Sequence, residues 1–130
     1  MIIVKFNADP MGAVRQTRAD AWKNRPAVLR YRAFKDSIRV QAAPFYLPPN
    51  PLAVDIDFFI AMPESWSDKK KAAMDGCWHR QKPDIDNLWK AVTDTLWPDD
   101  DSCISCGTTR KMWSKKGGII MTISVGQDAP

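Results

Sequence analysis

Residues 82–96 read Lys-Pro-Asp-Ile-Asp-Asn-Leu-Trp-Lys-Ala-Val-Thr-Asp-Thr-Leu, and they predict an amphipathic helix that begins beside two carboxylates. Pro83 suits a position just before this helix, and Pro98 suits one just after it. Asp84 or Asp86 can cap the first turn, because a carboxylate oxygen accepts hydrogen bonds from its free N–H groups. Apolar residues recur three or four positions apart, which favours one buried face: Ile85, Leu88, Trp89, Val92 and Leu96.

The polar face of this helix suggests a metal site. Asp86, Lys90 and Asp94 are spaced four apart and share one stripe, toward which Asp84 can turn. A second acidic cluster, residues 99–101, follows the helix. Carboxylates without histidine or thiolate are typical Mg²⁺ ligands, and a metal beside a lysine suits phosphate chemistry. A purely structural role, as a cap and an ion pair, remains the alternative.

The run from Lys82 to Lys90, together with Asp100-Asp101-Ser102-Cys103-Ile104, resembles the signature of the RusA-type Holliday junction resolvases. These are small endonucleases that bacteriophages and prophages often encode. The resemblance is specific from about His79 to Ile104 and looser as far as Val125. It implies that Asp84, Asp86 and Asp101 bind Mg²⁺, for which Mn²⁺ can substitute, and that Lys90 is catalytic. Three aspartates run together here, so Asp100 is the alternative third ligand in the neighbouring register.

The expected function is therefore a structure-selective DNA endonuclease that resolves four-way junctions in recombination and repair. A four-way junction has approximate two-fold symmetry, and a C₂ homodimer supplies two cleavage sites from one gene product. The resemblance implies the same dimer. A DNA-binding protein without catalytic activity is the alternative from another class.

The basic charge favours an anionic partner. The chain has 130 residues and a net charge of +4, with an isoelectric point of about 9.1. Residues 15–39 hold eight basic and two acidic side chains, a local balance of +6, so the remainder carries −2. A basic flank beside an acidic pocket suits a nuclease, although solvated surface explains a charge run equally well. The expected DNA-binding residues are Arg15, Arg18, Arg30, Arg39, His79, Arg80 and Lys82.

The cysteines permit a rival interpretation. Three cysteines argue against a disulfide framework, so a reducing bacterial cytoplasm is the expected location. No signal peptide or membrane span is expected, since apolar runs such as Val54–Met62 are short and carry charges. The rival interpretation is a zinc-stabilised interaction module that uses the pattern Cys77, His79, Cys103 and Cys106. His79 is otherwise expected to be a partly exposed, DNA-facing residue.

The remaining elements predict a single α+β domain over residues 1–130, with a mixed, mostly antiparallel sheet and helices packed on it. Strands are expected at 2–6, 52–62, 102–113 and 119–125, and residues 115–118 are expected to turn the last two into a hairpin. In the second strand Val54, Ile56 and Phe58 alternate with Asp55 and Asp57, which indicates one buried face. Residues 8–27 read as a basic loop, and helices are expected at 28–42 and, capped by Ser67, at 68–74.

Overall fold

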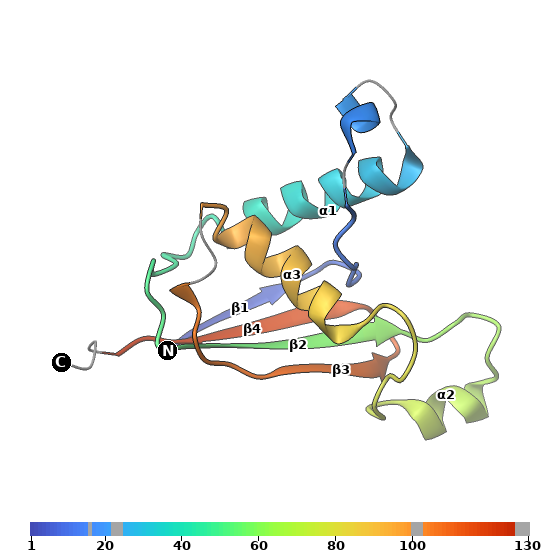
Figure 1. The fold of residues 1–130 in the computed structure, drawn as a ribbon. Helices are drawn as coiled ribbons and strands as arrows, with labels where there is room; N and C mark the ends of the chain where they lie inside the picture. Colours follow the sequence, from blue (N-terminus) through green and yellow to red (C-terminus); the bar gives the residue numbers. More distant parts are fainter. Residues whose placement is uncertain (16, 22–24, 100–102, 127–130) are drawn as a thin grey trace.

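Four strands form a mixed sheet, and two long helices lie on one of its faces (Figure 1). A computed structural model describes residues 1–15, 17–21, 25–99 and 103–126. The strands are β1 (Ile2–Phe6), β2 (Ala53–Ala61), β3 (Thr109–Ser114) and β4 (Gly118–Ser124), in the spatial order β1-β4-β2-β3. β4 is antiparallel to both β1 and β2, and β3 is parallel to β2. The predicted α+β class and mostly antiparallel sheet are therefore confirmed.

The core lies between the sheet and the helices, because alternate side chains of each strand point to the helical side. The predicted alternation in β2 is confirmed. Asp55 and Asp57 lie on the opposite face, where Asp55 accepts a hydrogen bond from the Thr108 main-chain N–H (2.7 Å). The strand residues of this core are Val4, Phe6, Val54, Ile56, Phe58, Ile119, Met121 and Ile123, and none is more than 3% exposed.

The two long helices are α1 (Pro26–Ala42) and α3 (Ile85–Leu96), which cross the same face of the sheet (Figure 1). Every third or fourth residue of α1 is buried, from Val28 to Ala42. In α3, Leu88 and Val92 are fully buried as predicted, whereas Ile85 at the helix start is 39% exposed. Ile85 thus leaves the core and becomes part of the surface around the carboxylates.

The shorter helices lie outside this two-layer core. α2 (Asp68–Met74) lies beyond the ends of β2 and β3 (Figure 1). Ser67 caps it as predicted, by accepting a hydrogen bond from the Lys70 N–H (3.1 Å). The prediction of a continuous loop over residues 8–27 is wrong. A short 3-10 helix, η1 (Arg18–Ala21), interrupts it, and α1 begins at Pro26 because proline suits the first turn of a helix.

The predicted hairpin between the last two strands is wrong. β3 and β4 follow each other in sequence, but β2 lies between them in the sheet. β3 is also shorter than predicted, since residues 103–108 run beside β2 without joining the ladder fully. There the carbonyls of Cys106 and Thr108 accept from the N–H groups of Val54 and Ile56 (3.0 and 2.9 Å). Gly107 permits this close approach, because a Cβ there would collide with the Val54 carbonyl oxygen.

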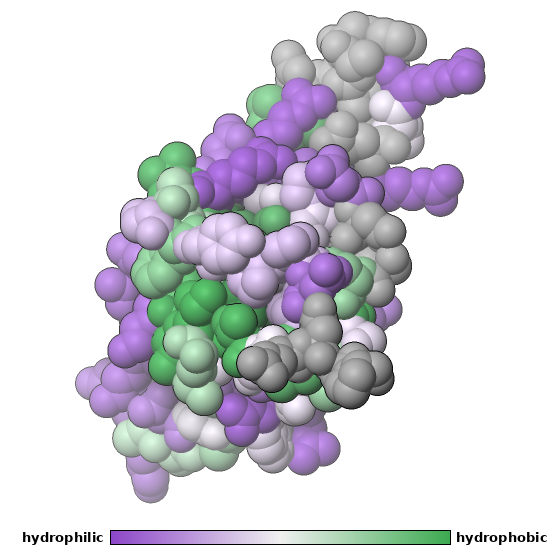
Figure 2. All heavy atoms as spheres, turned by 90° about the vertical axis from the view of Figure 1, so that its left-hand side faces the viewer, coloured by the Kyte–Doolittle hydropathy of each residue, from purple (hydrophilic) through white to green (hydrophobic). Residues whose placement is uncertain are grey.

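Figure 2 faces the end of the molecule where the N-terminus and the end of β4 lie, and it shows hydrophobic side chains gathered below a more hydrophilic upper region. Met1, Leu52 and Val125 are exposed at this end, where Leu52 donates its N–H to the Ser124 carbonyl (2.9 Å). Within the described part of the chain, no helix is long and apolar enough to cross a membrane.

Candidate functional site

The start of α3 presents its carboxylates to solvent. Asp84 occupies the N-cap position in extended conformation, and Asp86 lies in the first turn. Asp84 or Asp86 was predicted to cap the helix, and this is only half right, because Asp84 occupies the cap position but its side chain makes no capping hydrogen bond. Its carboxylate instead meets Lys82 Nζ at 3.2 Å, and the Asp84 side chain is 61% exposed. Because the Asp84 carboxylate oxygens accept no hydrogen bond from the N–H groups at the helix start, they remain able to bind a cation.

Lys111 of β3 fixes the loop that leads into this helix. Its Nζ donates to the carbonyl oxygens of Gln81 (2.6 Å) and Pro83 (2.8 Å), directly before Asp84. The sequence analysis missed this residue. The available signal was its place in the strand, since Lys111 shares a face with Trp113, which is buried. A lysine on the core side of a strand needs polar partners, and the two carbonyls supply them.

Asn87 holds the N-terminal segment against the same helix. Its Nδ2 donates to the Ala13 carbonyl, and the Ala13 N–H donates to the Asn87 carbonyl, both at 3.1 Å. Gly12 allows this close contact, because a Cβ there would lie 2.7 Å from Asn87 Nδ2. Sequence reasoning had identified neither the contact nor its partner. As a result, the loop that carries Arg15 begins beside the two carboxylates.

The prediction that His79 is partly exposed is wrong. The His79 side chain is buried, and its ring packs on Trp113 with 4.4 Å between centroids. Burial, with a further contribution from the nearby Lys111 charge, lowers the pKa of His79 from its usual 6.5, so the ring is neutral at pH 7. No local pattern in the sequence indicates that the residues before Lys82 pair with β3, as they do where Trp78 bridges Met112.

The predicted cations do not form one cluster. Arg15, Arg18 and Arg30 are exposed on the N-terminal loop, η1 and the first half of α1. Arg39 lies in the last turn of α1 and pairs with Asp36 at 3.2 Å, which leaves less of its charge for an external anion. Arg80 and Lys82 are exposed on the loop before α3. Arg15, two residues after the Ala13 contact with Asn87, and Arg80 with Lys82 therefore adjoin the segments beside the carboxylates, whereas Arg18, Arg30 and Arg39 lie on η1 and α1.

The polar stripe along α3 is exposed to solvent only in the first half of the helix. Lys90 is exposed one turn after Asp86, as predicted. Asp94 is partly buried, and its charge adds to burial in raising the pKa of Tyr31 on α1. The far end of the stripe therefore contacts α1, and the charged side chains of the helix itself that remain exposed near its start are Asp86 and Lys90.

The second acidic cluster begins at the opposite end of α3. Asp100 and Asp101, the two alternatives for the third ligand, lie outside the described residues. Their described neighbours Asp99 and Cys103 line a hollow together with Trp97, the C-cap residue of α3. The twelve residues of α3 rise about 18 Å, at roughly 1.5 Å each. This length separates Asp84 from the described residues on either side of the cluster.

The zinc alternative is not supported. Cys77, His79, Cys103 and Cys106 are all described, yet no three histidine, cysteine or acidic residues of the described chain form a metal-binding group. Cys77 and His79 lie beside β3, where their main chains bond to Trp113 and Lys111, whereas Cys103 lines the hollow beside Trp97. The sequence pattern failed because its two halves belong to different parts of the fold.

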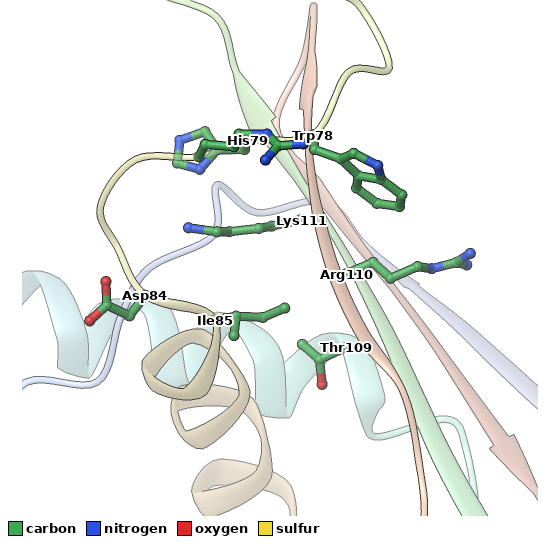
Figure 3. Close-up of a pocket in the computed structure, with 8 residues that line it drawn as sticks. Trp78, His79, Asp84, Ile85, Thr109, Arg110 and Lys111 are labelled. Carbon is green, nitrogen blue, oxygen red and sulfur yellow. The ribbon is translucent and has the colours of Figure 1, made fainter.

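A cavity of about 590 Å³ lies beside the start of α3 (Figure 3). Asp84 and Ile85 form one side of it, and β3 with the segment before the helix forms the other. Its lining residues are Trp78, His79, Arg80, Asp84, Ile85, Thr109, Arg110 and Lys111. The carboxylates are thus at the edge of an open, largely cationic hollow.

Comparison with known proteins agrees with this geometry. Residues 8–124 match the family model described as endodeoxyribonuclease RusA. This range includes the N-terminal loop, the carboxylates at the start of α3 and all but the first of the four strands. A search of curated proteins found no match. Because the family model covers most of its length, the chain belongs to the RusA family of endodeoxyribonucleases.

Proposed function

We propose that this protein is a Mg²⁺-dependent endonuclease that resolves four-way DNA junctions by hydrolysing paired phosphodiesters. Family membership supports the nuclease activity. The observation that carries the metal dependence is the exposed Asp84 carboxylate, which stands at a helix start without capping it. Together with Asp86 it offers hard oxygen ligands of the kind that Mg²⁺ prefers, and Mn²⁺ accepts the same ligand type.

Asp84 and Asp86 would hold the metal, with Asp101, or Asp100 in the alternative register, as the third ligand. A bound Mg²⁺ supplies a more acidic water and offsets charge on the phosphate. Lys90 would stabilise negative charge on the phosphate under attack, because it is an exposed point charge one turn from Asp86. Lys111 would act indirectly, by holding the loop before Asp84 in position.

DNA would lie over the two basic groups beside the carboxylates. Arg15 and Arg18 follow the loop segment that Asn87 holds, and Arg80 and Lys82 precede Asp84. Cations on both sides of an acidic pocket favour phosphate contacts that are independent of sequence. Such contacts suit an enzyme that recognises the shape of its substrate.

A homodimer would bring the separated carboxylates together. Asp84 and the described neighbours of the acidic cluster lie at opposite ends of α3, about 18 Å apart along the helix. A metal ligand set drawn from both ends is therefore assembled most readily by two chains in antiparallel contact. A C₂ dimer would build two such sites and match the two strands to be cut.

The first experiment compares cleavage of a four-way junction and a linear duplex of the same sequence, each with and without Mg²⁺. We expect cleavage of the junction alone, and only with the metal. Asp86→Asn should lower the cleavage rate at least a hundredfold while junction binding stays intact, because the substitution removes negative charge that faces DNA. Asp68→Asn changes the equivalent first-turn aspartate of α2 and serves as the control.

Retained cleavage by Asp86→Asn would contradict the metal site. Binding to the junction by the wild-type protein without cleavage under any divalent metal would instead favour the second candidate, a DNA-binding protein without catalytic activity. The exposed basic residues are what that second candidate would rely on.

A further inference from the structure

The cavity beside the start of α3 has the size and lining of a ligand site, and Asp84 is the one proposed metal ligand of the described chain that lines it. Its volume of about 590 Å³ falls within the range of small-molecule pockets. Arg80, Arg110 and Lys111 line it together with one carboxylate, Asp84, and Arg110 is itself paired with Asp57, so Arg80 and Lys111 supply the cationic charge. The hollow therefore favours an anionic ligand that extends from the carboxylates toward β3.

Trp78 is an exposed aromatic side chain on a fixed backbone. Its side chain is 54% exposed, which is unusual for a residue whose neighbours belong to the sheet. Trp78 bridges Met112 of β3, and main-chain hydrogen bonds hold both adjacent residues. The Trp113 N–H donates to the Cys77 carbonyl (2.9 Å), and the His79 N–H donates to the Lys111 carbonyl (3.2 Å). The indole is thus held in place without being buried.

Arg110 provides a second flat group on the same side. Its Nε and Nη2 donate to the two carboxylate oxygens of Asp57 at 2.7 and 2.8 Å, so the plane of the guanidinium is fixed. Figure 3 shows Trp78 and Arg110 projecting to one side of β3, whereas Asp84 lies on the other side at the helix start. Indole and guanidinium planes are the two surfaces on which proteins most often stack unpaired bases.

We propose that this cavity receives an unpaired nucleobase from the branch point, against the side of β3 that faces away from Asp84 and the proposed metal site. The proposal rests on the proposed nuclease function and adds a subsite to it. Trp78 stacks on the base, while the exposed Arg80 attracts a flanking phosphate. Moving a base out of the stack costs the least free energy at a branch point, because base pairing is already interrupted there. The cavity therefore favours branched DNA over continuous duplex.

The test measures binding without metal, so that cleavage does not enter. Four-way junctions with one abasic site, placed in turn at each position around the branch, are titrated with protein and followed by fluorescence anisotropy. The proteins are wild type, Trp78→Ala, Trp78→Phe and the control Tyr46→Ala, which removes another aromatic side chain that is 76% exposed. Tryptophan emission of wild type and Trp78→Phe is recorded with the intact junction.

We expect at least one abasic position to weaken wild-type binding about 5- to 150-fold, the range of one stacked base. The same abasic position should not weaken the binding of Trp78→Ala further. Trp78→Phe should retain most of the affinity but lose most of the emission quenching, and Tyr46→Ala should match wild type. Equal wild-type affinity for every abasic junction, or the same abasic loss in Trp78→Ala, would overturn the proposal.

The emission measurement keeps the test decisive if Trp78→Ala does not fold, because quenching that persists in Trp78→Phe also contradicts stacking on Trp78. The outcome is separable from that of the nuclease proposal. If an abasic position weakens the binding of wild type but not of Trp78→Ala, and no metal-dependent cleavage occurs, the base subsite is supported and the nuclease activity is contradicted. If metal-dependent cleavage occurs but no abasic position has this effect, the nuclease activity is supported and the base subsite is contradicted.

Discussion

At the scale of single residues, the side chains that support the carboxylates are as informative as the carboxylates themselves. Lys111 satisfies two carbonyls that would otherwise lose their partner, and it does so directly before Asp84. His79 is buried beside Lys111, whose carbonyl accepts a hydrogen bond from the His79 main-chain N–H. The His79 Nδ1 atom has no hydrogen-bond partner among the described residues. Each of these residues leads to a measurement.

Lys111→Met should loosen the loop before α3 while preserving the apolar part of the side chain. We expect unfolding to become easier by about 1–3 kcal/mol, because two carbonyls lose a charged donor. The Mg²⁺ concentration for half-maximal cleavage should rise severalfold, since Asp84 is held less firmly. Thermal unfolding and a metal titration measure the two effects, with Lys115→Met as the exposed control. An unchanged metal titration would mean that the loop does not position the ligand.

His79 makes stability depend on pH in a stated direction. Burial and Lys111 lower the pKa of His79 in the folded protein below the unfolded value of 6.5, so the unfolded chain binds more protons below that pH. Stability contributed by the neutral ring is present above pH 6.5 and is lost as the pH falls toward the folded pKa. The melting temperature of wild type should therefore fall more between pH 7.5 and 5.5 than that of His79→Phe. Parallel curves would contradict this.

At the scale of elements, the sequence predicted those whose pattern is local. Ile85, Leu88 and Val92 mark α3 by their spacing, and Val54, Ile56 and Phe58 mark β2 by their alternation, so both were found with bounds close to those observed. The predicted hairpin was wrong because residues 115–118 favour a turn, but a turn does not determine which strand β4 pairs with. Pairing partners depend on residues far apart in the chain, and the contacts of Asn87 and His79 were missed for the same reason.

The contact between α3 and the N-terminal loop should depend on Asn87. Asn87→Leu removes the side-chain bond to the Ala13 carbonyl and leaves the reciprocal main-chain bond in place. One lost hydrogen bond costs about 1 kcal/mol, or roughly fivefold in a local opening equilibrium. Trypsin should therefore cut after Arg15 about five times faster than in wild type. Asn50→Leu, at an exposed position in the connector before β2, should leave the rate unchanged, and equal rates in both variants would refute the contact's role.

At the scale of the whole molecule, the length of α3 predicts how the proposed sites are shared. If each metal site uses Asp86 of one chain and Asp101 of the other, Asp86→Asn and Asp101→Asn are inactive alone. Mixed dimers of the two variants contain one site with both aspartates and should nick one strand. If both aspartates come from the same chain, the mixture has no complete site and remains inactive. Nicking of a labelled junction by the refolded mixture measures this, with each variant alone as the control.

The central position of β4 also bears on how the protein is made. β1 pairs in the sheet only with β4 among the described strands, yet residues 7–117 lie between them in the sequence. During synthesis, β1, both long helices and β2 therefore emerge from the ribosome well before β4, which pairs with β1 and β2. Contacts so distant in sequence close slowly, and an unpaired strand edge invites association with other nascent chains. Cells that make this protein rapidly would need a chaperone to cover β1 and β2 until β4 emerges.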